Sequence, residues 1–203
     1  MIDQYPGTAS ECGPAGPKAA ADLCRRLYRG DVPFCGTARL SSCPRVGSGG
    51  RAAEQYQVIK DAFAAEGVPL ANAHITVNRF CHITDSKEEA LRFAENARYQ
   101  SRLASSLRRR QEVMQGTVLV DKPFPDEPPL EQIHNDLLIG DVETVAEKLA
   151  GEIRATDPVH MCFSFKVGAT PHRAAMRSME LMMGEVRPRV EQALGPLARR
   201  AAE

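Results

Sequence analysis

Residues 138–153 read LIGDVETVAEKLAGEI, and residues 159–188 read VHMCFSFKVGATPHRAAMRSMELMMGEVRP. In the first part, Asp141 can accept hydrogen bonds from the free amides at a helix start. Apolar residues then recur at helical spacing, and this stripe consists of Val142, Val145, Ala146, Leu149 and Ile153. Residues 159–165 form an apolar run of strand length that Gly168 ends. The order helix, strand, helix predicts a parallel sheet on which the helices pack.

A further helix is expected after this strand. Thr170 followed by Pro171 has the form of an N-cap and a proline at the first helical position. The apolar stripe of this helix, and hence its expected core face, consists of Met176, Met179, Met183 and Val186. Pro188 predicts the end of the helix, because proline lacks the amide that a helix interior needs.

These residues also form two longer patterns, IGxxETVAEKL at residues 139–149 and GxxPHxxxxRSMELxxxEVxP at residues 168–188. Together they resemble the carboxyl end of the bacterial-luciferase-like flavin monooxygenases. An ordinary terminal βα unit of any α/β protein would explain the apolar stripes, but not the PHxxxxRSME part. The resemblance implies a (β/α)₈ barrel that binds reduced flavin, or a deazaflavin, at the carboxyl ends of its strands.

Earlier residues supply further units of the same kind. Residues 52–66 suit a helix, residues 75–83 read as a buried strand, and Asp85 to Glu88 have the form of a capping box. The helix that follows is expected to run to about Arg110, and this strand–cap–helix order is similar to the family's sixth barrel unit. Residues 115–137 carry four prolines at positions 123, 125, 128 and 129 and are expected to be largely loop.

The fold class predicted is therefore α/β, as a partial (β/α)₈ TIM barrel of about the last three βα units. Residues 51–195 form this part, with 196–203 as a tail and 1–50 as an irregular amino-terminal leader. A complete barrel needs about 250 residues. The chain has 203, and the deficit is expected at its amino end.

The leader itself has two readings. Residues 1–50 hold Gly and Pro clusters and four of the six cysteines, without helical or alternating periodicity, which is typical of a disordered tail. Alternatively, the codons of residues 18–36, read one base later, permit the string PPPIYVAAS and later ETFRFAG. That string is similar to the family's fifth strand and the helix after it. The second reading is a broken gene with an insertion or deletion near codons 37–51.

Composition limits the classes of function. The 26 basic and 26 acidic side chains give a formal charge of zero, so no global field attracts nucleic acid or an anionic membrane. No apolar run has the length of a membrane span, and the first residues lack a signal pattern, so a cytoplasmic protein is expected. The cysteines show neither a disulfide framework nor zinc-ligand spacing, and no metal site is predicted.

The resemblance implies an oxidoreductase in which flavin performs the oxygen chemistry and the protein supplies binding and orientation. The expected cofactor is reduced FMN, with a deazaflavin as the alternative. A small organic substrate and O₂ are the implied partners, with a flavin reductase and a second copy of the chain as further candidates. The expected cofactor-binding residues are Lys166 and Gly168, after the second strand, and Arg79, within the first. No catalytic residue is identified.

Other candidate residues have structural interpretations. His82 and His160 are expected to be hydrogen-bonded core histidines, and His172 is expected to pack at a helix start. Arg108 to Arg110, with Arg102 nearby, suggest a basic patch or, more simply, a solvated helix end. Arg79, alone in a buried strand, calls for a carboxylate or phosphate partner.

The sequence thus predicts the carboxyl-terminal segment of a luciferase-like monooxygenase, which inserts one oxygen atom of O₂ into an organic substrate. This chain alone is expected to be inactive. The alternative is a non-catalytic barrel fragment that acts as an assembly or binding module.

The frame hypothesis predicts a specific nucleotide sequence. Codons 18–36, read one base later, should spell Pro-Pro-Ile-Tyr-Val followed by the helix sequence of the family's fifth unit. Sequencing the DNA across codons 18–60 measures this directly. Codons that spell an unrelated string in that frame would contradict the hypothesis.

Overall fold

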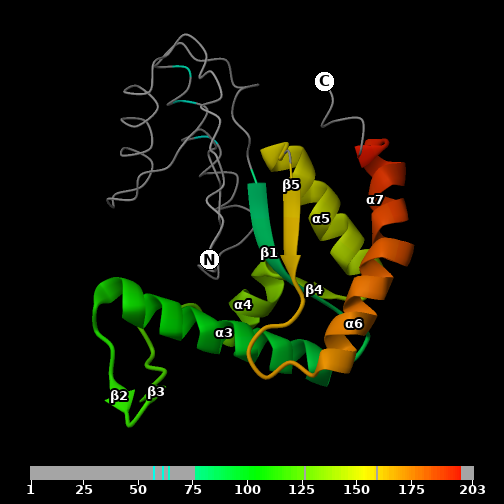
Figure 1. Ribbon diagram of the computed structural model, residues 1–203. Helices are drawn as coiled ribbons and strands as arrows, with labels where there is room; N and C mark the ends of the chain where they lie inside the picture. The colour runs from blue at the N-terminus through cyan, green and yellow to red at the C-terminus, as the bar shows by residue number, and fades with distance from the viewer. Residues whose placement is uncertain are drawn as a thin grey trace, which may run out of the picture.

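A parallel sheet of three strands organises the computed structural model, which describes residues 57, 61, 64, 76–125, 127–158 and 160–197. β1 (Thr76–Ile83) is the middle strand by hydrogen bonding, because it pairs with both β4 (Leu138–Gly140) and β5 (His160–Ser164). The three strands are labelled in Figure 1. β5 pairs with residues 76–80 of β1, and β4 pairs with residues 81–83. Residues 1–50 and most of the predicted helix 52–66 lie outside the described residues, although positions 57, 61 and 64 are helical.

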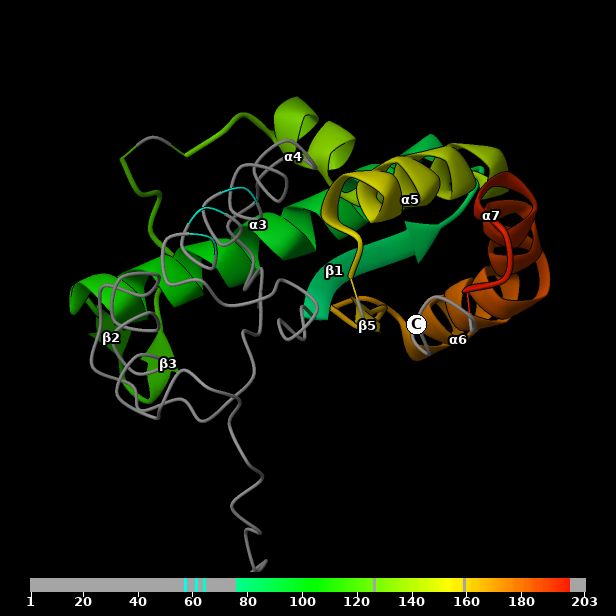
Figure 2. The same cartoon turned by 90° about the horizontal axis from the view of Figure 1, so that it is seen from above.

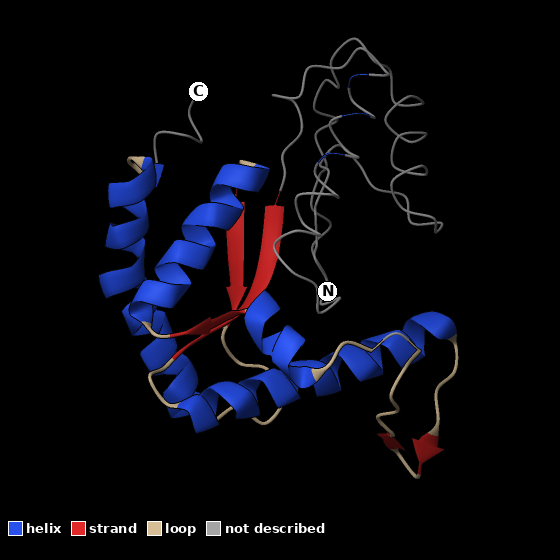
Figure 3. Ribbon diagram, turned by 180° about the vertical axis from the view of Figure 1, so that it is seen from behind, coloured by secondary structure: helices blue, strands red, loops and turns tan. Residues whose placement is uncertain are grey.

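Helices cover both faces of this sheet, because side chains of a strand point alternately to its two sides. Cys81 and Ile83 of β1 pack against α5 (Val142–Thr156) and α7 (Arg187–Leu194). Phe80 instead packs against α3 (Lys87–Arg109), and Ile133 of α4 (Leu130–Asp136) joins the same cluster. The opposite view shows α5 and α7 together on one side of the strands (Figure 3). The predicted α/β class is confirmed.

The strand order differs from that of consecutive barrel units. Neighbouring strands of a (β/α)₈ barrel follow one another in sequence, and its helices form one outer ring. Here β5 pairs with β1 instead of β4, and helices lie on both faces. The described strands form an open sheet with no closed barrel, so the partial barrel is not confirmed. β1 pairs with β4 over three residues and with β5 over five, so it takes the middle position that β4 would hold between consecutive barrel strands.

Two helix starts follow from local capping. Asp141 accepts a hydrogen bond from the amide of Thr144 at 2.8 Å, as the sequence predicts for the start of α5. At α3 the predicted cap was wrong by one residue, because Ser86, not Asp85, accepts the bond from Glu89 N. The amide of Ser86 already donates to Thr84 Oγ1, so the Glu89 carboxylate has no need to turn back to it. Glu89 is thereby directed toward the end of the sheet.

The segment predicted as loop, residues 115–137, is more ordered than its prolines suggest. It contains β3 (Val118–Leu119), which pairs antiparallel with β2 (Met114–Gln115), and the helix α4. Arg102 of α3 ties the segment down through ion pairs with Glu127 at 2.6 Å and Asp121 at 3.2 Å. Seen from above, α3 extends beyond the sheet and the β2–β3 hairpin lies at its far end (Figure 2).

The carboxyl-terminal helices correct the predicted start of one helix and its predicted end at Pro188. α6 (His172–Leu181) begins after Pro171 without a side-chain cap, because the Thr170 hydroxyl donates to the carbonyl of Val167. Pro188 does not end the helix: the π-helical segment η2 (Met182–Val186) comes immediately before it, and Pro188 lies in the first turn of α7. A wider turn accommodates the proline ring, which would otherwise clash with the preceding turn.

The predicted apolar face of α6 points outward. Met176, Met179 and Met183 are 41%, 45% and 59% exposed, whereas Ala175 and Ser178 are buried. Small residues let α6 approach β1 closely, and Ser178 Oγ accepts a hydrogen bond from the amide of Ile83 at 3.1 Å. The prediction of a methionine core was therefore wrong for these three residues. Apolar periodicity alone does not predict which face of a helix is buried when the helix packs through small side chains. Among the described helices, none has the length and apolar composition to cross a bilayer.

Two glycines near α5 should respond oppositely to alanine. Gly140 has φ of +147°, and an added Cβ would lie 2.9 Å from Cγ2 of Thr144, so Gly140→Ala should lower the free energy of unfolding by about 1–3 kcal/mol. Gly151 lies in the helix with nothing within 4 Å of an added Cβ, so Gly151→Ala should raise it by about 0.5–1 kcal/mol. Urea denaturation of both variants measures the difference. Changes of the same sign would contradict the β4–α5 geometry.

Candidate functional site

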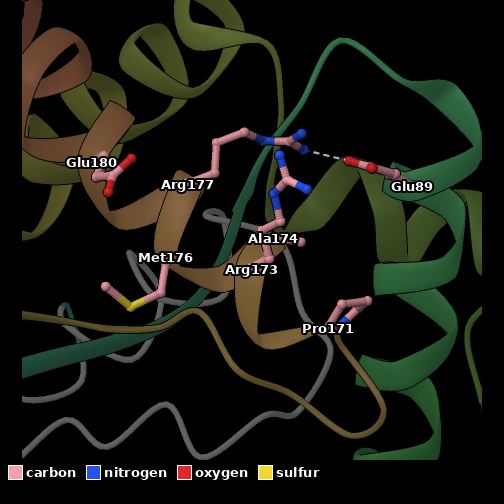
Figure 4. Close-up of a pocket in the computed structure, with 7 residues that line it drawn as sticks. All are labelled: Glu89, Pro171, Arg173, Ala174, Met176, Arg177 and Glu180. Carbon is pink, nitrogen blue, oxygen red and sulfur yellow. Dashed lines mark hydrogen bonds and ion pairs between the residues drawn. The ribbon is translucent and has the colours of Figure 1, made fainter.

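The carboxyl ends of β1 and β5 meet the starts of α3 and α6, and this edge holds the candidate site. In open α/β sheets, ligands bind outside the carboxyl ends of the strands, where neighbouring connections leave in opposite directions. A pocket of about 600 Å³ lies beside this edge, against α6 and the start of α3. Its lining residues are Glu89, Pro171, Arg173, Ala174, Met176, Arg177 and Glu180 (Figure 4).

Glu89 is the centre of the hydrogen bonds at this edge. Its Oε2 accepts a hydrogen bond from Thr84 Oγ1 at 2.8 Å. The same oxygen accepts another from the guanidinium of Arg177 at 2.5 Å (Figure 4). The hydrogen bond from Thr84, and then that from Arg177, lower the pKa of Glu89 below its ordinary value. The carboxylate thus joins the loop after β1, the first turn of α3 and the middle of α6.

His82 lies directly behind this network. It is 2% exposed, stacks on Phe93 with ring centroids 4.7 Å apart, and has Nδ1 3.4 Å from Ser178 Oγ. Its Nε2 is 3.9 Å from Glu89 Oε2. Burial lowers the pKa of His82, and the nearby Glu89 carboxylate only partly opposes this effect. The prediction of a hydrogen-bonded core histidine is confirmed for His82, whose neutral form the site favours.

The loop after β5 carries two of the predicted cofactor residues. Lys166 is exposed, and its Nζ donates to the carbonyl of Thr170. Gly168 has φ of +53°, and a Cβ at this position would lie 3.0 Å from Oδ1 of Asn96 in α3. Asn96 also accepts from the amide of Ala169 at 3.3 Å and donates to Thr170 Oγ1. The close approach that Gly168 permits is thus made by a side chain of this protein.

Arg79 lies on the other face of β1. Its Nε is 3.1 Å from Oε1 of Glu152 in α5, and both side chains are at most 5% exposed. The guanidinium also donates to the carbonyl of Asp136 at 2.6 Å. Burial raises the pKa of Glu152, while Arg79 opposes that shift. The expected carboxylate partner of Arg79 is found, but the pair lies on the face that α5 covers, away from the pocket residues.

The remaining sequence candidates lie elsewhere. His160 is exposed, so its prediction as a core histidine was wrong, because it starts an edge strand. His172 is the exposed first residue of α6. Arg108, Arg109 and Arg110 are exposed at the end of α3, as a solvated helix end requires. No group of three or more potential metal ligands occurs within the described residues.

Sequence reasoning named neither Glu89 nor Arg177 as site residues. A signal for them was available, since Glu89 follows Thr84 in the strand–cap–helix pattern and Arg177 belongs to the RSME part of the second pattern. The two residues are 88 positions apart, and the contact between them depends on the fold. Their pairing places a cation and a carboxylate at one edge of the sheet, which can orient a polar ligand.

Comparison with known proteins gives a fold and no family. No model of a known family matches the chain. The protein y4vJ of Sinorhizobium fredii (strain NBRC 101917 / NGR234), described as uncharacterized, is 27% identical over 139 residues, which are 68% of this chain and 40% of y4vJ. The monooxygenase RslO1 from Streptomyces bottropensis superimposes with a TM-score of 0.51 and 14% identity, over 85% of this chain and 45% of RslO1. The chain shares its fold with part of a monooxygenase. It spans less than half the length of either protein.

The buried ion pair predicts a non-additive pair of substitutions. Arg79→Met leaves the Glu152 carboxylate buried without its cation, and should lower the free energy of unfolding by about 3–5 kcal/mol. The double variant Arg79→Met/Glu152→Leu should recover most of this loss, since an apolar pair of similar volume replaces the ions. Chemical denaturation of the single and double variants measures both values. A double variant as unstable as the sum of its single variants would contradict the pairing.

Proposed function

We propose that this chain corresponds to the carboxyl-terminal portion of a luciferase-like flavin-dependent monooxygenase. The reaction class is the insertion of one oxygen atom of O₂ into a small organic substrate. The observation that carries the proposal is agreement between two sources: the patterns at residues 139–149 and 168–188, and the fold shared with the monooxygenase RslO1. A cytoplasmic location and a flavin reductase that supplies reduced flavin belong to the same proposal.

The residues expected to bind flavin do not form a cradle for it in this chain. The space beside Gly168 is occupied by Asn96, Lys166 is bonded to its own loop, and Arg79 is paired on the opposite face. Reduced FMN, or a deazaflavin, is therefore proposed as the cofactor of a longer relative such as y4vJ. For this chain alone we expect weak flavin binding or none, and no monooxygenase activity.

The (β/α)₈ barrel is likewise proposed for a longer relative and not for this chain alone. In a barrel of consecutive units β4 would lie between β1 and β5, and β5 would have to exchange its pairing with β1 for one with β4. The loops at the carboxyl ends of the strands, with Thr84, Glu89 and Arg177, would then lie on the face where barrel enzymes bind their ligands.

A second candidate function is that of a non-catalytic assembly module. It is favoured by the large apolar side chains that the described residues leave exposed on α6 and on the β2–β3 hairpin. A flavin-free oligomer of the longer relative y4vJ in gel filtration would support this candidate over the enzyme.

The proposed function predicts different flavin binding by this chain and by its longer relative. Each protein is mixed with FMN and passed through a gel-filtration column, and absorbance of the protein peak reports retained flavin. We expect FMN to be retained by y4vJ but not by the chain of 203 residues. If y4vJ retains no flavin, the family assignment is wrong. Stoichiometric flavin on the present chain would overturn the expectation that it is inactive alone.

A further inference from the structure

The outward face of α6 is apolar in its middle and charged at its sides. Met176, Met179 and Met183 are spaced by three and four residues, as in the seam of a helix pair, and each is more than 40% exposed. The close-up shows Met176 and Glu180 projecting from the helix away from Glu89 (Figure 4). Three large apolar side chains in one row on an exposed helix are unusual for a surface that only water covers.

The charges beside this row are self-complementary. Arg173 and Glu180 are seven residues apart and so lie on the same side of the methionine row. Neither makes an ion pair with another residue in the part of the chain that the structure describes. Arg177, between them, is instead bound to Glu89. The helix therefore presents one cation and one carboxylate, two turns apart, that are not paired with other described residues.

We infer that α6 pairs antiparallel with α6 of a second copy of this chain, around a two-fold axis. In this pairing Met176 packs on Met179 of the second copy, and the symmetry makes the same contact twice. Arg173 then lies opposite Glu180 of the second copy, again twice. Met176 and Met179 take the core positions a and d of a heptad, whereas Arg173 and Glu180 both take the flanking position e. In an antiparallel helix pair the e positions of the two helices face one another. A zero net charge adds no general repulsion between the copies.

The self-complementary charges favour a second copy over an unrelated partner. An isologous interface needs the same patch to supply both halves of each contact, and one helix of ten residues, extended by η2, does so here. The inference does not depend on the proposed function, since it uses only exposed side chains of α6. A dimer formed through the outer edges of β4 or β5, which no other described strand covers, is the main competing geometry.

Charge reversal tests the pairing in the full chain by sedimentation equilibrium over a range of concentrations. Arg173→Glu and Glu180→Arg should each weaken the dimer about tenfold, because each places like charges opposite one another at two symmetric positions. The double variant Arg173→Glu/Glu180→Arg should restore the wild-type dissociation constant. Failure of the double variant to recover the dimer, with each single variant weakened, would overturn the antiparallel register.

The methionine row has a matched control. Met179→Lys should weaken the dimer by about 100-fold or more, since two apolar contacts are lost per dimer. Leu91→Lys changes a side chain of α3 that is as exposed as Met179, at 45%, and should leave the dissociation constant unchanged. Both side chains are exposed, so circular dichroism should show the same fold for both variants. The inference is overturned if the wild-type chain is monomeric at all concentrations. It is also overturned if Met179→Lys leaves the dimer intact, as is expected of a dimer that pairs through sheet edges.

Discussion

The pairing of β1 on both of its edges is the constraint on which the other elements depend. Its first five residues pair with β5 and its last three pair with β4. The orientation and register of both neighbouring strands are therefore set by β1. The alternation of its side chains then decides the layers, because Phe80 faces α3 whereas Cys81 and Ile83 face α5 and α7. An edge strand could not do this, since it bonds to one neighbour only.

The two faces of β1 differ in how their charged and polar side chains are paired. On the α5 face a full charge, Arg79, is removed from water and balanced by Glu152 of the covering helix. On the α3 face a group of polar side chains lies at the carboxyl end of β1, where His82, Thr84 and Glu89 share hydrogen bonds with α6. A buried ion pair contributes little net stability but penalises any shift of α5 along the strand, because each charge would lose its partner. Arg79 and Glu152 therefore fix the register of α5 on β1.

Local features were predictable from the sequence because their causes are local. The strand at 76–83, the helix α5 and its Asp141 cap, and the extent of α3 follow from apolar periodicity and capping residues within one segment. Features that depend on distant partners were not. The outward methionines of α6 depend on Ser178 reaching the amide of Ile83, and the order within residues 115–137 depends on Arg102. The passage of the helix through Pro188 depends on the π turn before it.

The same distinction applies to the residues that carry the resemblance. Arg177 and Ser178 of the RSME pattern bind Glu89 and the end of β1, Gly168 gives room to Asn96, and Gly140 brings β4 close to Thr144. Each has a structural role within the described residues and needs no cofactor to explain its presence. The patterns therefore report how the α3, α5 and α6 units join the sheet. Chemistry on flavin has to be provided by groups that face an open space, and among the described residues the pocket beside Glu89 and Arg177 offers charged groups in such a position.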